Sequence, residues 1–317
     1  MAKAFITGIS GFAGSHLAEL CLTEGFEVSG LTRDASATPN LTVVLDRIAL
    51  YEADLSSCER LTEILDKAMP DVVFHLAAET AGNTPEHRLI ETNMIGTANL
   101  LAAIARLSPV PTLLVASSSA VYGRGSRADA HMCEADALSP LSAYGRSKLA
   151  QEKLSLCVAP VLGIPVIVAR AFNQSGPREN QGFVAASIAG QIAQIEGGMA
   201  PPRIAVGRRD TSRDFSDVRD IARGYLLAAT RGRPGEVYNL ASGVGVSIQH
   251  LVDSLVRLSG RPIEIVDDPA RMRPAELLSQ IGDATKAWQE LGWKPRISFD
   301  TMLCDLLDHV RMPPLRK

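Results

Sequence analysis

The sequence lacks the charge excess that a nucleic-acid or membrane partner requires. Of its 317 residues, 32 are Lys or Arg and 35 are Asp or Glu, so the formal net charge is -3 at pH 7. Proteins that bind polyanions or anionic bilayers usually carry a clear basic excess. The composition therefore argues against both kinds of partner, although local clusters of arginine can still bind a small anion.

Cysteine is also scarce and shows no pattern. A disulfide framework has paired cysteines, and a zinc site has closely spaced ones such as CxxC. Here the number is odd, the spacing is wide and no CxxC occurs, so we predict free thiols in a reducing compartment and no metal site. The five cysteines are Cys21, Cys58, Cys133, Cys157 and Cys304.

Long hydrophobic runs are missing as well. A long uncharged stretch, residues 154–169, is broken by Pro160, Gly163 and Pro165, so it is too short and interrupted to span a bilayer. The apolar stretch near the N-terminus ends after a few residues, which is not typical of a signal peptide. We therefore expect a cytoplasmic protein. Its length and its hydrophobic content of 46% predict about two domains with a large core.

The most informative pair is Tyr144 and Lys148, which are four residues apart. On a helix this spacing places both side chains on one face. A neighbouring ammonium favours the phenolate, so the pair suits proton transfer at an alcohol or a carbonyl. An isolated YxxxK is more often a half-buried ring beside a solvated charge, so the interpretation depends on other motifs.

A glycine-rich turn follows the first apolar run. Residues 3–7 are typical of a buried parallel strand, Gly8, Gly11 and Gly14 follow it, and a helix is expected over 15–24. Such a turn lets a pyrophosphate approach the backbone N–H groups of a helix N-terminus. The spacing GxxGxxG is one residue off the common dinucleotide fingerprint, and glycines also occur in turns for steric reasons alone.

The residues that follow the second predicted strand, 27–31, indicate whether the site prefers NAD(H) or NADP(H). Sites that prefer NAD usually place an acid there to bind the ribose 2′-OH. Here Thr32 and Arg33 come first, and Arg33 can pair with a 2′-phosphate. The pattern favours NADP(H), and Asp34 one residue later leaves NAD(H) open.

Strand-like runs alternate with helical ones along the first half of the chain, which predicts an α/β fold with a doubly wound parallel sheet. Ligands bind at the carboxyl edge of such sheets. The residues expected at that edge, because they end or follow predicted strands, are Asp54, Leu55, Leu76, Ala77, Ala78, Ser117, Ser118 and Ser119. Asn93 falls in a helical segment, where packing is the alternative role.

Beyond Arg170 the composition changes, and a second, smaller α/β unit is predicted to be interleaved with the first. We expect the first domain to contain residues 1–172 and about 216–241, and the second about 173–215 and 242–317. The second unit contains four clustered arginines among aspartates, for which a surface ion-pair network is the alternative to anion binding. They are Arg208, Arg209, Arg213 and Arg219.

Together these motifs resemble the extended short-chain dehydrogenase/reductases over essentially the whole chain. The match rests on residues 7–14, 54–55, 117–123 and 144–148, with support from 213–220 and 291–295. That family modifies nucleotide sugars with a bound nicotinamide cofactor and a Rossmann-like fold. The resemblance implies that Tyr144 is the acid/base, that Lys148 holds the nicotinamide ribose, and that Ser118 binds the reacting sugar oxygen.

The resemblance also implies the other site residues and a homodimer formed through helices near Asn93 and Tyr144. The implied cofactor contacts are Gly8, Gly11, Phe12, Ala13, Gly14, Thr32, Arg33, Asp54, Leu55, Leu76, Ala77, Ala78, Asn93, Tyr144, Lys148 and Arg170. The implied substrate contacts are Ser119, Asn173, Arg178, Arg213, Arg273 and Glu276.

Two features narrow the reaction. Sugar-nucleotide 4,6-dehydratases of this family carry an acid where this chain has Ala120, and a methyl group cannot take part in the elimination of water. Residues 268–276 resemble the guanine-nucleotide loop of GDP-mannose-type members. The expected reaction is therefore reduction of the C4 keto group of GDP-4-keto-6-deoxy-D-mannose to GDP-D-rhamnose. A talose-type product, a 4-epimerase and a non-enzymatic member of the fold remain alternatives.

Overall fold

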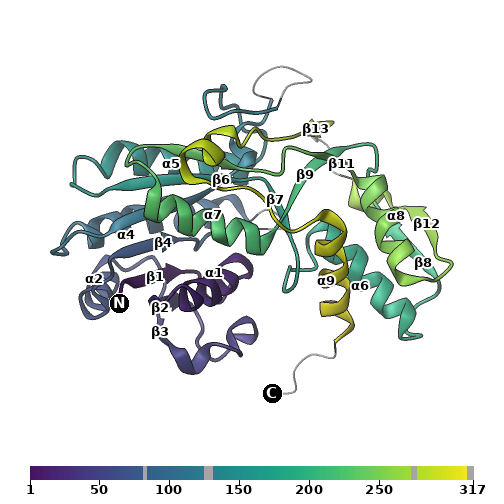
Figure 1. Cartoon of the computed structure of the whole chain (residues 1–317), viewed down its shortest axis with the longest axis horizontal. Coiled ribbons are helices and arrows are strands. Elements are labelled where there is room, and N and C mark those ends of the chain that lie inside the picture. The colour runs from purple at the N-terminus through teal and green to yellow at the C-terminus, as the bar shows by residue number, and fades with distance from the viewer. Residues whose placement is uncertain (81–83, 125–130, 273–276, 313–317) are drawn as a thin grey trace.

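The computed structural model describes residues 1–80, 84–124, 131–272 and 277–312 (Figure 1). Its larger part is built on a seven-stranded parallel sheet in the order β10-β6-β5-β4-β1-β2-β3. This confirms the predicted α/β class and the doubly wound sheet. The strands are β1 (Lys3–Thr7), β2 (Glu27–Thr32), β3 (Ile48–Glu52), β4 (Val72–His75), β5 (Thr112–Ser118), β6 (Val166–Ala171) and β10 (Val237–Leu240).

Helices cover both faces of this sheet, which is why its strands are continuous apolar runs in the sequence. On β1, Phe5 packs into the core under α2 and α4, whereas Ile6 packs into the core under α1 and α7. The alternation follows the two-residue period of a strand. The helices of this part are α1 (Phe12–Thr23), α2 (Cys58–Ala68), α3 (Glu86–Ile90), the π-helical turn η3 (Glu91–Ile95), α4 (Gly96–Ile104), α5 (Ala143–Val158) and α7 (Val218–Arg231).

Short 3-10 and π turns complete the connections. They are η1 (Pro39–Leu41), η2 (Leu45–Arg47), η4 (Ser119–Val121), η5 (Pro269–Arg271) and the π turn η6 (Ala287–Leu291). The strand predicted over residues 3–7 has the observed bounds, and the one predicted over 27–31 extends one residue further, to Thr32. The first helix begins three residues earlier than predicted, at Phe12, because Gly11 already serves as its N-cap.

A second, smaller unit follows β6 and lies at one end of the molecule (Figure 1). It contains a four-stranded and a two-stranded sheet with three helices, whose apolar faces share one core. The strands are β7 (Asn173–Ser175), β9 (Ser212–Asp217), β11 (Gly245–Ser247) and β13 (Ser279–Gln280), and β8 (Arg203–Val206) with β12 (Glu264–Asp267). The helices are α6 (Val184–Glu196), α8 (Ile248–Ser259) and α9 (Phe299–Arg311).

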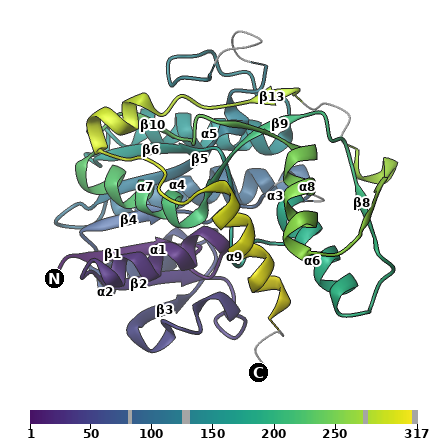
Figure 2. The same ribbon diagram turned by 45° about the vertical axis from the view of Figure 1, so that its right-hand side comes forward.

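The chain crosses between the two units several times, since α7 and β10 return to the large sheet after β9. In both views α9 lies on the side of the smaller unit that faces α1 (Figures 1 and 2). Asp214 on β9 helps to fix this junction, because its carboxylate accepts hydrogen bonds from the backbone N–H groups of Ser242, Gly243 and Gly282 at 2.7, 2.9 and 3.1 Å. Within the described ranges, no helix has the length and apolar character needed to cross a bilayer.

Candidate active site

The turn between β1 and α1 has the shape that a dinucleotide pyrophosphate requires. Gly8 has φ +72°, and a Cβ there would lie 2.9 Å from the backbone N and Cα of Ala77. Gly11 caps α1 without a side-chain hydrogen bond, and the first turn of the helix contains no acidic residue. The first N–H groups of a helix lack intrahelical partners and attract anions. The glycine-rich turn therefore fits the predicted cofactor.

Arg33 does not stand free beside this turn. Its Nη1 atom is 2.6 Å from Oε1 of Glu79, which follows β4, and Nη2 of Arg88 lies 3.8 Å from the same oxygen. The neighbouring Thr32 is buried, and its hydroxyl is 2.8 Å from that of Ser10. A 2′-phosphate at Arg33 would therefore compete with, or add to, an existing carboxylate partner.

Asn93 is fully buried, and its side chain is hydrogen-bonded to the backbone of Glu79. Its Oδ1 accepts from the N–H of Glu79 at 2.8 Å, and its Nδ2 donates to the carbonyl of Glu79 at 3.0 Å and to the hydroxyl of Ser147 at 2.9 Å. All these polar atoms are satisfied within the protein. The structure thus places Asn93 as a support between the β4 loop and α5, in keeping with the packing alternative.

The predicted catalytic residues come together at the carboxyl edge of the sheet. Ser118 ends β5, and Ser142 caps α5 by accepting from the N–H of Gly145 at 3.0 Å, which sets Tyr144 in the first turn. The side chain of Ser118 lies close enough to the Tyr144 hydroxyl group to favour its ionised form. One turn later Lys148 is buried, and its Nζ donates to the carbonyl of Ala116 at 2.5 Å and to Oε1 of Gln151.

Burial is the largest influence on the acidity of both Tyr144 and Lys148. It raises the pKa of the Tyr144 phenol, and the hydrogen bond with Ser118 only partly offsets the rise. Burial also lowers the pKa of Lys148 to about 7, although the negative charge of Glu152 raises it. The lysine nitrogen is bound by Ala116 and Gln151, and its effect on the acidity of Tyr144 stays a prediction.

Arg170, predicted to contact the cofactor, is instead enclosed beneath the site with 3% of its surface exposed. It forms a bidentate ion pair with Glu152, with N···O distances of 3.0 and 2.6 Å. Its Nη1 also donates to the hydroxyl of Tyr122 at 2.9 Å, and Ser117 donates to Glu152 at 2.9 Å. The sequence could not reveal this role, because the partners lie on three other elements.

Arg178, predicted to bind substrate, lies in the loop after β7 and reaches back to α1. Its Nη1 donates to the hydroxyl of Ser15 at 3.1 Å and its Nη2 lies 2.5 Å from Oε1 of Glu19. His16 on the same helix contacts the carbonyl oxygen of Pro177 at 2.9 Å. The structure therefore places Arg178 in the contact between the two units.

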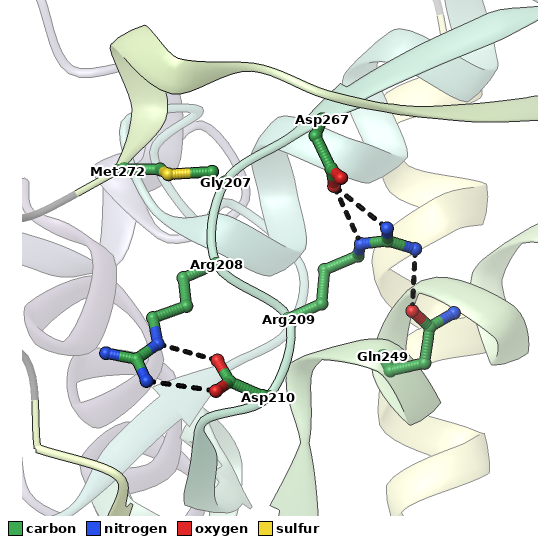
Figure 3. A pocket seen from close by; sticks show the side chains of 7 residues that line it. All are labelled: Gly207, Arg208, Arg209, Asp210, Gln249, Asp267 and Met272. Atoms are coloured by element: carbon green, nitrogen blue, oxygen red, sulfur yellow. Dashed lines mark hydrogen bonds and ion pairs between the residues drawn. The ribbon is translucent and has the colours of Figure 1, made fainter.

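Two of the four clustered arginines, Arg208 and Arg209, line a cavity of about 410 Å³ beside β8, β12 and α8 (Figure 3). Arg208 forms two hydrogen bonds to Asp210, at 2.6 and 2.9 Å. Arg209 lies 2.8 Å from Asp267 and donates to Gln249 at 2.8 Å. Both guanidinium groups are thus held by acceptors within the protein, as the ion-pair alternative predicted.

The other predicted substrate residues lie nearer the sheet. Ser119 is buried and its carbonyl accepts from Nε2 of Gln280 at 2.7 Å. Nη1 of Arg213 donates to the carbonyls of Ser212 and Leu277 at 2.8 and 2.9 Å, and Asn173 is half-buried at the start of β7. Arg273 and Glu276 lie outside the described residues.

The remaining predicted cofactor residues surround the carboxyl edge between β1, β3 and β4. Asp54 is exposed and accepts from the N–H of Ser56 at 2.9 Å, whereas Leu55 is buried. The N–H of Ala77 donates to the hydroxyl of Thr7 at 3.1 Å. This edge contains the point where the strand order reverses between β1 and β4, which is where such sheets bind ligands.

Comparison with known proteins agrees with this geometry. The sequence profile of the family described as GDP-mannose 4,6 dehydratase matches residues 5–306. The chain belongs to the GDP-mannose 4,6 dehydratase family. Its fold and motifs place this family member among the extended short-chain dehydrogenase/reductases.

Relatives in this family include both reductases and dehydratases. The chain is 37% identical to a GDP-6-deoxy-D-mannose reductase of Pseudomonas aeruginosa over 96% of each chain, and 28% identical to a GDP-mannose 4,6-dehydratase of Sinorhizobium fredii over 96% and 95%. Among solved structures, one described as RMD from Pseudomonas aeruginosa, in complex with NADPH, matches this chain with a TM-score of 0.84 and 34% identity. The match covers 98% of this chain and 99% of that one. A UDP-glucose 4-epimerase of Thermotoga maritima gives 0.88 and 27% over 98% of each.

Three residues of this family member were missed at the sequence level, namely Glu79, Gln151 and Glu152. Gln151 and Glu152 follow Lys148 by three and four residues, and helical spacing could have indicated that they share its face. Glu79 gives no comparable signal, because its contact with Arg33 depends on the order of strands in the sheet.

Proposed function

We propose that this chain uses NADPH to reduce the C4 keto group of GDP-4-keto-6-deoxy-D-mannose, forming GDP-D-rhamnose. The observation that carries the proposal is the assembly of Ser118, Tyr144 and Lys148 at the sheet edge beside a methyl group at Ala120. The identity of 37% to a GDP-6-deoxy-D-mannose reductase supports the same substrate.

Tyr144 supplies the proton in this reaction. A phenol whose pKa is raised by burial keeps its proton at neutral pH, so it is ready to act as an acid when the keto oxygen gains negative charge. Ser118 donates or accepts at the same oxygen, and it also stabilises the phenolate that remains. The buried ammonium of Lys148 favours that phenolate electrostatically.

The cofactor site is assigned to the glycine-rich turn and to the strand ends beside it. NADPH, when bound, supplies the hydride, and the chain supplies binding, orientation and the proton. We assign the pyrophosphate to Gly8, Gly11 and the first turn of α1, and the 2′-phosphate to Arg33. NADPH is favoured because RMD was solved with NADPH, and NAD remains a second cofactor because related structures contain it.

Dehydration is disfavoured although the family takes its name from it. The elimination of water from the sugar requires a carboxyl group at the position of Ala120, and a methyl group carries no proton. Ala120 is also closely packed against Gly145, since a Cβ added to Gly145 would lie 2.6 Å from the carbonyl oxygen of Ala120. We therefore expect no conversion of GDP-mannose by this chain.

A 4-epimerase is the second candidate, since a UDP-glucose 4-epimerase shares the fold with a TM-score of 0.88. An epimerase would use the same three residues but retain its cofactor through both half-reactions. Absorbance at 340 nm with the keto sugar and NADPH separates the two functions. Stoichiometric loss of NADPH supports the reductase, whereas tightly bound NAD with no net consumption supports the epimerase.

The remaining assignments belong to the same proposal. We assign the sugar nucleotide to Asn173, Arg213, Arg273 and Glu276, and a homodimer to the surface of α3, η3 and α5. Ile90 and Ile95 support the dimer, since 43% and 51% of these side chains are exposed on adjacent turns. We place the reaction in the cytoplasm, in keeping with five cysteines that form no disulfide.

A further inference from the structure

Behind Lys148 lies a row of buried polar side chains that the reaction does not yet explain. Gln151 follows Lys148 by one helical turn, and its Oε1 accepts a hydrogen bond from the lysine Nζ. Its Nε2 donates to the hydroxyl oxygen of Thr97 at 2.9 Å, and that hydroxyl donates to the carbonyl of Asn93 at 2.8 Å. Gln151 and Thr97 are fully buried.

The row continues through His75 on β4 to the end of β1. Nε2 of His75 lies 2.8 Å from the hydroxyl oxygen of Thr97, and its Nδ1 lies 2.8 Å from the hydroxyl oxygen of Thr7. Because the one proton of Thr97 goes to Asn93, its oxygen accepts from both His75 and Gln151. His75 is therefore neutral with its proton on Nε2, which agrees with burial lowering its pKa to about 3.

These directions leave Gln151 one possible orientation. If its amide were flipped, Nε2 would face the ammonium of Lys148 and Oε1 would face the oxygen of Thr97, whose only proton is already donated. Two donors and two acceptors would then oppose each other in a buried site, where unpaired polar groups are costly. The carbonyl of Gln151 is thus fixed toward Lys148 by residues on two other elements.

We propose that Gln151 is a positioning residue that holds the side chain of Lys148 in place and stabilises its ammonium form. The proposal deepens the assigned reduction and rests on it, because the ammonium acts there through Tyr144. It extends the catalytic apparatus to the row formed by Gln151, Thr97, His75 and Thr7, which ends beside the glycine-rich turn.

Few charged groups around Lys148 stabilise its ammonium form, so the neutral acceptor Oε1 of Gln151 matters for the protonation of the lysine. Glu152 on the same helix favours the ammonium, but Glu152 is already paired with Arg170 on β6. His75 on β4 is neutral, and Tyr144 keeps its proton at neutral pH. Since burial brings the pKa of Lys148 to about 7, the ammonium and amine forms are closely balanced. A change at Gln151 should therefore move the balance.

The test uses two variants that should shift the lysine in opposite directions. Gln151→Glu keeps the shape and adds a negative charge, so the pKa of Lys148 should rise by about one to three pH units. Gln151→Met removes the acceptor, so the pKa should fall by about one pH unit. The direct readout is the pH titration of the Lys148 ¹³Cε NMR signal in protein labelled at lysine, assigned with Lys148→Arg.

The matched control is Ser155→Ala, which removes a buried hydroxyl one turn further along α5. That hydroxyl bonds the backbone carbonyl of Gln151 at 2.8 Å and does not touch Lys148, so the titration should not move. Equal pKa values in wild type, Gln151→Glu and Gln151→Met would overturn the proposal, as would shifts of the same sign in both variants. Each folded variant is first verified by circular dichroism.

Kinetics provide the second readout. The rate of keto-sugar reduction should fall as pH rises through the pKa of Lys148, because the ammonium is lost. This alkaline limb should move to higher pH in Gln151→Glu and to lower pH in Gln151→Met, whereas a purely structural role would lower the rate at every pH alike. If the keto sugar is not reduced at all, the proposed function fails, and the NMR titration still decides the role of Gln151.

Discussion

Tyr144 and Lys148 occupy the same site, yet burial moves their acidities in opposite directions. Both groups lose hydration, which disfavours the charged form, so the pKa of the phenol rises and that of the ammonium falls. A protonated phenol suits an enzyme that reduces a ketone, since the acid must hold a proton before the hydride arrives. The same arrangement would suit the oxidative direction less well at neutral pH.

Tyr144→Phe tests the acid directly, because it removes one oxygen with little change in shape. Proton transfer by a positioned side chain typically contributes about 10²–10⁴-fold, so kcat for reduction should fall by about that factor. Binding of NADPH, measured by titration of its fluorescence, should stay near the wild-type value. A kcat within a few-fold of wild type would show that another group supplies the proton.

Arg33→Ala tests the cofactor preference. A charge-assisted contact is worth roughly 1.5–3 kcal/mol, so NADPH affinity should fall on the order of ten- to a hundred-fold while NADH affinity changes little. Glu79 already pairs with Arg33, so Glu79→Gln is the informative companion variant. The effect of Glu79→Gln on NADPH binding should disappear when it is combined with Arg33→Ala. Equal losses for both cofactors in Arg33→Ala would mean that the residue only supports the fold.

At the scale of elements, the loop after β7 connects the two units and contains an unusual carboxyl group. Glu179 has 9% of its surface exposed and accepts a hydrogen bond from Ser175 at 2.6 Å. Burial raises the pKa of its carboxyl to about 8. Arg178, the preceding residue, adopts φ +73° and forms an ion pair with Glu19 on α1. The loop thus combines a strained backbone position with a buried acid at the junction.

Glu179→Gln should stabilise the protein at alkaline pH. The folded state holds the Glu179 proton to a higher pH than the unfolded state does, so stability falls as pH rises from about 4.5, the ordinary value, to about 8. Within that window the loss is about 1 kcal/mol per pH unit for one group. The variant should therefore have a higher Tm than wild type at pH 8 and a similar Tm at pH 4.5, as measured by calorimetry.

Glu27→Gln, at an exposed position that begins β2, serves as the control for this charge change, and its Tm should follow wild type at both pH values. If Glu179→Gln lowered the Tm at pH 8, the carboxylate would be the form that the fold prefers, and the assigned direction of its pKa shift would be reversed.

Elements also show how far the sequence predicts the structure. The strand over residues 3–7 and the glycine-rich turn could be predicted because apolar runs and glycine spacing are local signals. Arg170 could not be placed, since a lone arginine at a strand end looks the same whether it faces a ligand or a buried glutamate. Its partner Glu152 becomes visible only when α5 packs on β5 and β6.

At the scale of the whole molecule, the proposed function divides the work of binding between the two units. The large sheet carries the glycine-rich turn, Tyr144 and Lys148, whereas the smaller unit supplies the arginines and a cavity of about 410 Å³. The change in composition after Arg170 predicts the interleaving, and the domain bounds that follow from it stay a prediction. The ion pairs inside the cavity could be anticipated only as an alternative, because the interleaved arginines and aspartates fit either role.

The nucleotide should be selected by the smaller unit. We expect GDP to raise the Tm of the protein more than UDP or dTDP at equal concentration, because a site that hydrogen-bonds one base leaves polar groups unpaired with another. Arg273→Ala should largely remove the GDP effect and leave the NADPH effect intact. Equal shifts from all three nucleotides would leave the family in place and remove GDP-sugars from the proposed function.

The most direct test of the proposed function follows the hydride itself. The protein is supplied with GDP-4-keto-6-deoxy-D-mannose and NADPH carrying deuterium at the transferred position, and the product sugar is identified by NMR. The account predicts GDP-D-rhamnose with one deuterium at C4. Recovery of unreduced keto sugar, or a product without deuterium at C4, would contradict it.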